Sequence, residues 1–169
     1  MRLYYKKHIE AGEKRPEARE GLEVRRITPP LFSSLRNFLW GIYTRLTGGF
    51  HYEYQLWRGD KMVSKDELVT RIPNFRFIPK GGLHLGPGWT PKDERGKGYH
   101  RYLQAHVLAS HPGRDIYTGV NDDNVASIRC VEKNGCKLFA KGRKTKLGFY
   151  IITEMIEHQT GTKKINIER

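Results

Sequence analysis

The feature that most constrains the fold is a glycine-bearing turn placed between an interrupted apolar stretch and an amphipathic segment. The turn lies at residues 94–103 and contains two closely spaced glycines, Gly96 and Gly98. Before it, residues 82–90 are largely apolar but broken by Gly-Pro-Gly at 86–88. After it, apolar residues recur at helical spacing, namely Leu103, Val107 and Leu108. This order predicts a strand, a glycine loop and a helix.

Such an order is suited to binding an anion. Glycines allow backbone N–H groups to turn toward a ligand, and the N-terminus of a helix adds about half a positive charge. A diphosphate is the kind of ligand that such a turn binds. The same run of residues also suits any exposed turn, so both interpretations stay open on this segment alone.

A second informative segment, residues 120–136, changes that balance. Together the two segments resemble the GNAT superfamily of acyl-CoA-dependent N-acyltransferases. That family holds the coenzyme A pyrophosphate with an Arg/Gln-x-x-Gly-x-Gly/Ala loop, which corresponds here to Arg95, Gly98 and His100. Its Asn-x-x-Ser helix ends in Lys-x-Gly-Phe, which corresponds to Asn124, Ser127, Lys133, Gly135 and Cys136.

The sequence also departs from the family pattern. His100 replaces a small residue, Cys136 replaces Phe, and Pro91 lies one residue further from Arg95 than the family's Pro-x-x-Arg-Gly would place it. The tyrosine that often acts as general acid in the family corresponds to Val131. The resemblance therefore supports coenzyme binding more strongly than it supports a particular proton relay.

The resemblance implies an α/β (α+β) fold of the GNAT type, with a central, twisted, mostly antiparallel mixed sheet flanked by helices. We expect one domain at 1–156 and a polar C-terminal tail at 157–169. The residue patterns predict strands at 2–9, 22–27, 50–57, 61–72, 82–90, 115–120, 137–140 and 147–156, with a basic turn at 141–146.

Helices are predicted at 31–46, at 98–110 and from a cap at Asp122 or Asp123 to Gly135. The first carries an apolar stripe that includes Leu35, Leu39 and Leu46. Base rates favour a core-facing helix there over a helix lying on a membrane surface. In GNAT-like proteins this region covers the acceptor site.

The activity implied by the resemblance is transfer of an acetyl group from acetyl-CoA, as cosubstrate, to a primary amine by direct attack in a ternary complex, with no metal. His84 is the first candidate for the base, because an unperturbed imidazole titrates near neutrality. Glu67 and Glu53 are alternatives, although either also suits a cross-strand ion pair. Candidate proton donors are Tyr99, Tyr117 and Cys130.

The predicted coenzyme site comprises the loop, the start of its helix and the second segment. Its members are Trp89, Thr90, Arg95, Gly96, Lys97, Gly98, Tyr99, His100, Arg101, Asn124, Ser127 and Lys133, followed by Arg129. Three of these have simpler interpretations: Asn124 as a helix cap, Lys133 as a surface charge and Trp89 as a core residue.

The charge leaves a second class of function open. Lysine and arginine outnumber acidic residues by 31 to 18, a formal charge of +13, which attracts nucleic acid, anionic membranes or phosphorylated ligands. The alternative hypothesis is a catalytically weak GNAT-fold module that binds nucleic acid or another anionic partner. The enzyme hypothesis is favoured, with a small-molecule or protein amine as substrate and a monomer or homodimer as the assembly.

The two cysteines, Cys130 and Cys136, are too few for a disulfide framework and match no zinc-ligand spacing. No stretch of about 18 uncharged apolar residues is present in the sequence. We therefore expect a soluble, cytoplasmic protein without a membrane span.

Overall fold

The computed structural model describes residues 1–156, so the predicted polar tail at 157–169 lies outside the described residues. The strands are β1 (Arg2–His8), β2 (Leu22–Ile27), β3 (His51–Arg58), β4 (Lys61–Thr70), β5 (Leu83–Leu85), β6 (Asp115–Asn121), β7 (Lys137–Lys144) and β8 (Tyr150–Met155). The helices are α1 (Leu35–Leu46), α2 (Tyr99–Ala109) and α3 (Val125–Lys133), with short 3-10 turns η1 (Pro73–Phe75) and η2 (Lys92–Glu94).

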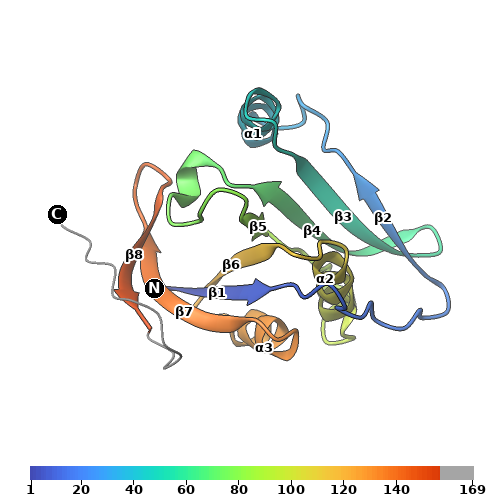
Figure 1. The fold of residues 1–169 in the computed structure, drawn as a ribbon. Coiled ribbons are helices and arrows are strands. Elements are labelled where there is room, and N and C mark those ends of the chain that lie inside the picture. The colour runs from blue at the N-terminus through green and yellow to red at the C-terminus, as the bar shows by residue number, and fades with distance from the viewer. Residues whose placement is uncertain (157–169) are drawn as a thin grey trace.

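All eight strands form one mixed sheet in the order β2-β3-β4-β5-β6-β1-β7-β8. Neighbouring strands are antiparallel except for β5 and β6, which are parallel. The N-terminal strand β1 lies between β6 and β7, near the middle of the ribbon in Figure 1. The predicted α+β class with a mostly antiparallel sheet is confirmed.

The sheet buries a separate apolar cluster on each face. Because neighbouring side chains of a strand point to opposite faces, Leu68 and Val69 on β4 belong to different clusters. Leu68 packs with Leu103 and Val107 of α2, whereas Val69 packs with Phe75 and other residues of the loop at 71–82. Helix α2 therefore covers one face near β4, and the η1 loop covers the other.

The sheet opens where β5 ends. Leu85 is the last β5 residue that pairs with β6, whereas the following segment stays with β4. Gly86 donates its N–H to the carbonyl oxygen of Glu67 (2.7 Å), and Trp89 and Lys65 exchange two backbone hydrogen bonds of 2.8 Å. A gap thus forms between residues 86–89 and the end of β6, and β5 is much shorter than the expected strand at 82–90.

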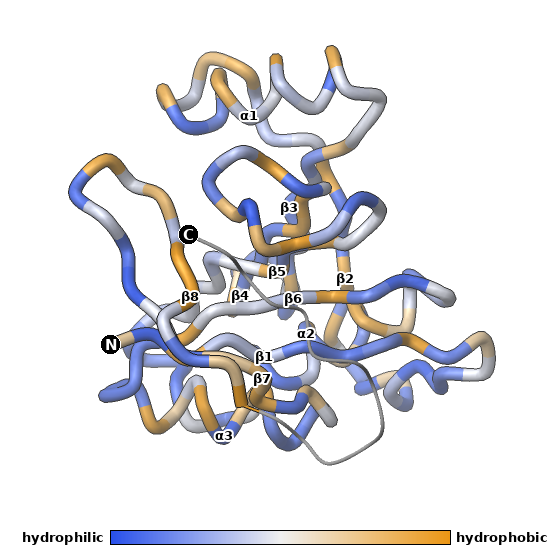
Figure 2. The backbone as a smooth tube through the Cα atoms, turned by 60° about the vertical axis from the view of Figure 1, so that its left-hand side comes forward, coloured by the Kyte–Doolittle hydropathy of each residue, from blue (hydrophilic) through white to orange (hydrophobic). Residues whose placement is uncertain are grey.

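Helix α1 is present but packs differently from the prediction. Ser34 caps its N-terminus, its side-chain oxygen accepting the N–H of Asn37 (3.1 Å). Thr44 is its single buried residue, and the apolar stripe is largely exposed at Leu35, Leu39 and Leu46. Figure 2 shows α1 standing at the margin of the molecule with hydrophobic residues along it. The expectation of a core-facing stripe is therefore wrong for most of the stripe. Tyr43, at one edge of it, packs on the core together with the neighbouring Trp40, which the stripe does not include.

Element boundaries also differ from the predicted ones. Helix α1 begins at Leu35, because Ser34 provides the cap. Helix α3 is capped by Asn124, whose side-chain oxygen accepts the N–H of Ser127 (3.1 Å), and not by Asp122 or Asp123. Strand β7 runs on to Lys144, because residues 140–144 pair with β8, so the basic segment is mostly strand and not turn.

Candidate active site

The larger cavity, about 690 Å³, lies between the segment after β5, the start of α2 and one side of α3. It is lined by eleven of the twelve predicted coenzyme residues, Lys97 being the exception. Gly88, Glu94, Ala126, Arg129 and Cys130 complete the lining. The interpretation of Trp89 as a core residue is wrong, since 46% of its surface is exposed.

The N-terminus of α2 faces this cavity. Gly98 is its N-cap with φ of 77°, in the left-handed region that favours glycine, and Gly96 has φ of 79°. No acidic side chain lies in the first turn of α2. The first backbone N–H groups of the helix and its partial positive charge are therefore available to an anion.

The side chains around this end are also cationic. Arg95, Arg101, Arg129 and Lys133 line the cavity, and none of them forms an ion pair within residues 1–156. Among the described residues, Glu94 provides the single carboxylate of the lining. The cavity as a whole therefore attracts a polyanion such as a diphosphate.

Glu94 organises the loop that leads into α2. Its buried carboxylate accepts hydrogen bonds from Lys61 (2.7 Å), Lys97 (2.8 Å) and Arg58 (3.0 Å). The bonds from Lys61 and Lys97 hold the pKa of Glu94 at about 2, so its charge is balanced by cations. Lys97, predicted in the coenzyme set, is thus directed to Glu94, and its side chain does not line the cavity.

His100 lies under the segment that follows β5. Its Nδ1 is 3.3 Å from Oγ of Ser64, and its Nε2 is 3.6 Å from Oδ2 of Asp66. Burial lowers the pKa of His100, so the ring is neutral near pH 7. The ring contacts the backbone of Gly88, where a Cβ would lie 2.7 Å from Nε2.

Asp66 is a fully buried carboxyl group beneath the same segment. Its Oδ1 accepts the N–H of Glu67 at 3.0 Å. Burial raises the pKa of Asp66 to about 8, so the group is mostly protonated at neutral pH. Acidic residues in a strand usually lie on its exposed side, and the sequence contains no signal that Asp66 is buried.

Helix α3 forms the opposite wall of the cavity. Asn124 is both its N-cap and a lining residue, so the two interpretations of this residue coincide. Cys130 also lines the cavity, and its Sγ is 3.6 Å from Oε1 of Gln104. Burial raises the pKa of the Cys130 thiol to about 12, which keeps it protonated. Val131 is buried in the core and presents no polar atom.

A second cavity, about 370 Å³, opens on the other face of the sheet. Both cavities border the interruption after β5: Gly86 and Pro87 line the second, and Gly88 lines the first. The other residues of the second cavity are Arg2, Arg36, Trp40, Asn74, Phe75, His84, Leu85, Gly119, Lys144, Gly148 and Tyr150. The gap beside residues 86–88 is therefore a place where two ligands could meet.

His84 lines this second cavity, but it does not have the property for which it was predicted. Burial, followed by the charge of Arg2, lowers its pKa to about 3. Phe75 stacks on its ring at a centroid distance of 3.8 Å, and neither ring nitrogen has a hydrogen-bond partner within the described residues. The nearby N–H of Gly86 is already donated to Glu67. The expectation of an imidazole that titrates near pH 7 is wrong.

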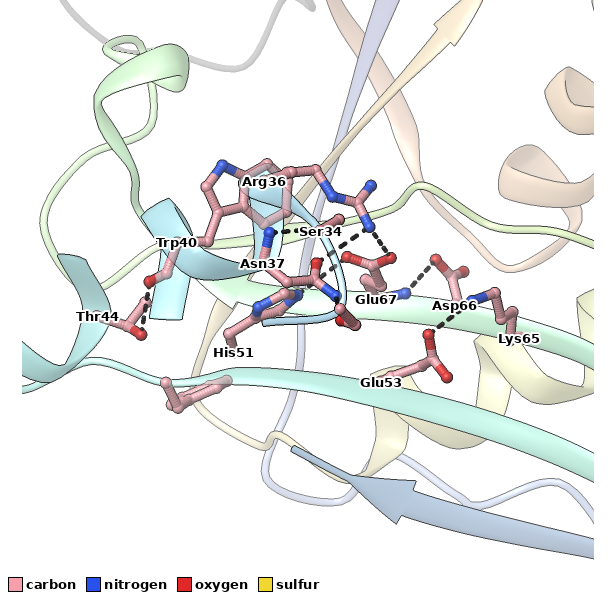
Figure 3. Close-up of polar contacts among 12 residues, drawn as sticks. Ser34, Arg36, Asn37, Trp40, Thr44, His51, Glu53, Lys65, Asp66 and Glu67 are labelled. Carbon is pink, nitrogen blue, oxygen red and sulfur yellow. Dashed lines mark hydrogen bonds and ion pairs between the residues drawn. The ribbon is translucent and has the colours of Figure 1, made fainter. Parts of the chain in front are cut away.

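Glu67, the second candidate base, lies on the same face of the sheet with its carboxylate fully engaged. Arg36 donates to one oxygen at 2.5 Å, and Nε2 of His51 lies 3.0 Å from the other (Figure 3). Trp40 flanks both partners, edge-on to His51 and beneath the Arg36 guanidinium. Glu67 is thus a buried anion that fixes α1 and Arg36 at the edge of the second cavity.

The remaining predicted residues lie outside both cavities or have local roles. Glu53 accepts bonds from Lys65 (2.7 Å) and Gln55 (2.6 Å), which is the cross-strand arrangement weighed from the sequence. Tyr117 is buried beside Phe139 and lines neither cavity. Tyr99 lines the first cavity, and its hydroxyl accepts a hydrogen bond from Arg58 at 2.8 Å.

Solved structures share the fold of this chain. A GCN5-related N-acetyltransferase from Sphaerobacter thermophilus matches with a TM-score of 0.56 at 14% identity, over 81% of this chain and 48% of that chain. An acetyltransferase of the GNAT family from Colwellia psychrerythraea matches with a TM-score of 0.53 at 13% identity, over 81% and 52%. The chain has a GNAT-like fold.

A tandem GNAT protein from the clavulanic acid biosynthesis pathway also matches, with a TM-score of 0.52 at 15% identity, over 81% of this chain and 50% of that chain. The chain thus spans about half the length of these GNAT structures. No protein-family model and no curated protein sequence matches it. The GNAT likeness therefore rests on the fold.

Two further observations bear on the kind of site. Among residues 1–156, no group of three or more His, Cys, Asp or Glu side chains is arranged to hold a metal ion. Within the same residues, no helix has both the length and the apolar character that a membrane crossing requires.

Proposed function

We propose that this protein is an acetyl-CoA-dependent N-acetyltransferase that acylates a primary amine. The observation that supports the proposal most strongly is the larger cavity, where the uncapped N-terminus of α2, four cationic side chains and α3 converge next to the gap in the sheet. In a GNAT-like fold, this is the arrangement expected to hold a coenzyme A diphosphate.

The residues fit such a ligand. Gly96 and Gly98 supply the left-handed backbone conformations of the loop before α2. Arg95, Arg101, Arg129 and Lys133 supply attraction, and the one carboxylate among the described lining residues, Glu94, is already paired with cations. The cavity then extends toward Gly88 and the gap beyond β5, so an extended ligand with its anionic end at α2 can reach the other face of the sheet. Acetyl-CoA supplies the acyl group as a thioester that an uncharged amine attacks directly in a ternary complex.

The chain contributes mainly positioning to this reaction. The second cavity brings the acceptor to the gap, with the Glu67–Arg36 pair at its edge and His84 at its wall. Cys130, whose thiol stays protonated and lines the cavity next to residue 131, is our candidate donor of a proton to the departing thiolate. The proton that the attacking nitrogen loses then restores the Cys130 thiol. Both cysteines are free thiols, which supports our proposal of a cytoplasmic location.

The test is an assay of CoA thiol release from acetyl-CoA with a panel of amines. Release that depends on an added amine, together with mass-spectrometric detection of the acetylated amine, is the expected result. Binding of acetyl-CoA without release by any class of amine would limit the function to coenzyme binding. An absence of binding would leave the basic binding module as the function to pursue.

A further inference from the structure

The second cavity carries more positive charge than the acidic groups around it neutralise. Three cations line it, namely Arg2, Arg36 and Lys144, and no aspartate or glutamate of residues 1–156 does. Arg36 is neutralised by Glu67 at 2.5 Å. Within the described residues neither Arg2 nor Lys144 forms an ion pair, so two positive charges of this cavity have no counter-charge.

These two cations converge on one ring. The Arg2 guanidinium lies 5.0 Å from the centroid of Tyr150, and Nζ of Lys144 lies 5.6 Å from the same centroid. Tyr150 in turn stacks on Phe75 at 4.5 Å and 4°, and Phe75 stacks on His84. The cavity thus has an aromatic wall that ends in a cationic pair.

The wall also contains unsatisfied polar atoms. His84 is 6% exposed, and neither of its ring nitrogens has a partner within residues 1–156. The Nε of Arg2 is likewise buried without a hydrogen bond, although its terminal nitrogens donate to Asn121 (3.1 Å) and to the carbonyl oxygen of Gly119 (2.7 Å). Buried polar groups of this kind are costly unless a ligand or water completes them.

We propose that the second cavity binds an acceptor amine that also carries an anionic group, a carboxylate or a phosphate, held by Arg2 and Lys144 beside Tyr150 and hydrogen-bonded by His84. This inference rests on the acetyltransferase function proposed above. The amine then lies toward Gly86 and Pro87, at the gap between the two cavities. An acceptor with a second positive charge, such as a diamine, would be repelled by the same pair of cations.

The test uses acetylated products, because they bind without turnover and isolate the anionic group. N-acetyl-L-phenylalanine and N-acetyl-L-phenylalaninamide differ in the carboxylate alone. N-acetyl-O-phospho-L-serinamide and N-acetyl-L-serinamide differ in the phosphate alone. Calorimetric titration of the full chain with each pair, with and without CoA, is expected to give at least about tenfold tighter binding of the anionic member of one pair.

Substitutions in the second cavity test whether the preference for the anionic ligand arises there. Lys144→Gln and Arg2→Gln are expected to reduce the preference severalfold, while Lys146→Gln, on the same hairpin but outside both cavities, leaves it unchanged. Because Arg2 also holds the end of β6, Lys144→Gln is the variant that decides if Arg2→Gln fails to fold.

The outcomes separate this inference from the proposed function. Equal affinity for both members of both pairs, or a preference that Lys144→Gln leaves undiminished, would overturn the anionic acceptor even if acetyl-CoA binds normally. A preference that disappears in Lys144→Gln, in a protein that does not bind acetyl-CoA, would establish the anion site and remove the acetyltransferase function. The pair that shows the preference distinguishes a carboxylate from a phosphate.

Discussion

Gly88 and His100 fit each other, because the imidazole of His100 occupies the space that a side chain on residue 88 would need. A Cβ there would lie 2.7 Å from Nε2 of His100 and 3.3 Å from Nδ1. His100 is also the residue that departs from the small residue of the GNAT loop. The absence of a side chain at residue 88 therefore explains how a bulky ring is accommodated beneath the predicted coenzyme site.

Gly88→Ala tests this relationship. The added methyl group is expected to displace His100 from Ser64, to destabilise the protein by about 1–3 kcal/mol and to weaken acetyl-CoA binding severalfold. Thermal unfolding and calorimetry measure the two effects. Gly12→Ala is the matched control, since a Cβ on Gly12 meets nothing within 4 Å. Wild-type stability and affinity in Gly88→Ala would show that the ring is not held in this position.

Asp66 predicts a particular dependence of stability on pH. Its pKa is raised to about 8 in the folded state, whereas an unfolded aspartate has a pKa of about 3.9. The folded state therefore holds this proton more tightly, and the stabilisation is fully present below pH 4 and lost as pH rises through 8.

Asp66→Asn removes this titration while keeping the shape of the side chain. The variant is expected to be more stable than the wild type at pH 9, by about 1 kcal/mol or more, and to lose the decline in stability between pH 4 and 8. Denaturant unfolding across that range is the measurement. A variant that is less stable than the wild type at pH 9 would indicate that Asp66 is ionised in the folded protein, with a partner for its charge.

The low pKa of His84 predicts that this residue adds no inflection to the pH–rate profile near neutral pH. With a pKa of about 3, it stays neutral from pH 5 to 9 and contributes no inflection near neutrality. His84→Gln should lower the acylation rate by removing a hydrogen-bonding group from the second cavity, with little change in acetyl-CoA affinity and no change in the shape of the profile. Loss of an inflection between pH 6 and 7.5 in the variant would restore His84 as the base.

The salt dependence of ligand binding distinguishes the enzyme hypothesis from the basic binding module. Binding of DNA or RNA through the +13 surface should weaken by orders of magnitude between about 50 and 200 mM salt, because counterion release dominates such complexes. Acetyl-CoA, held by oriented N–H groups as well as charges, should weaken far less. Titrations with a short duplex and with acetyl-CoA over one salt series measure both slopes. Tight nucleic-acid binding at physiological salt, without acetyl-CoA binding, would favour the module.

The elements that the sequence predicts well are those with strong local signals. The glycines at 96 and 98 adopt the left-handed conformation that few other residues tolerate, and Gly-Pro-Gly at 86–88 ends the pairing of β5 with β6. The order of strand, loop and helix follows from these positions. Eleven of the twelve predicted coenzyme residues therefore line one cavity, because they belong to one loop, the start of α2 that follows it and one side of α3.

What the sequence does not predict depends on contacts between distant segments. Lys97 is drawn to Glu94, which itself is fixed by Lys61 and Arg58 from the β3–β4 hairpin. The low pKa of His84 arises from burial under Phe75 and from Arg2, residues that only the folded sheet brings together. The exposed stripe of α1 likewise follows from how Trp40 docks, because amphipathic spacing does not specify which side of a helix finds the core.

The central claim is that the α2 N-terminus binds the diphosphate of acetyl-CoA, and Gly98 allows the most direct measurement. Gly98→Asp places a carboxylate at the start of the helix, whereas Gly98→Asn has nearly the same shape and the same tolerance for the left-handed φ of 77° without the charge. Calorimetry at physiological salt should give one-to-one micromolar binding to the wild type, weakened binding to the asparagine variant and none to the folded aspartate variant. Equal affinity in the two variants would contradict the assignment of the site.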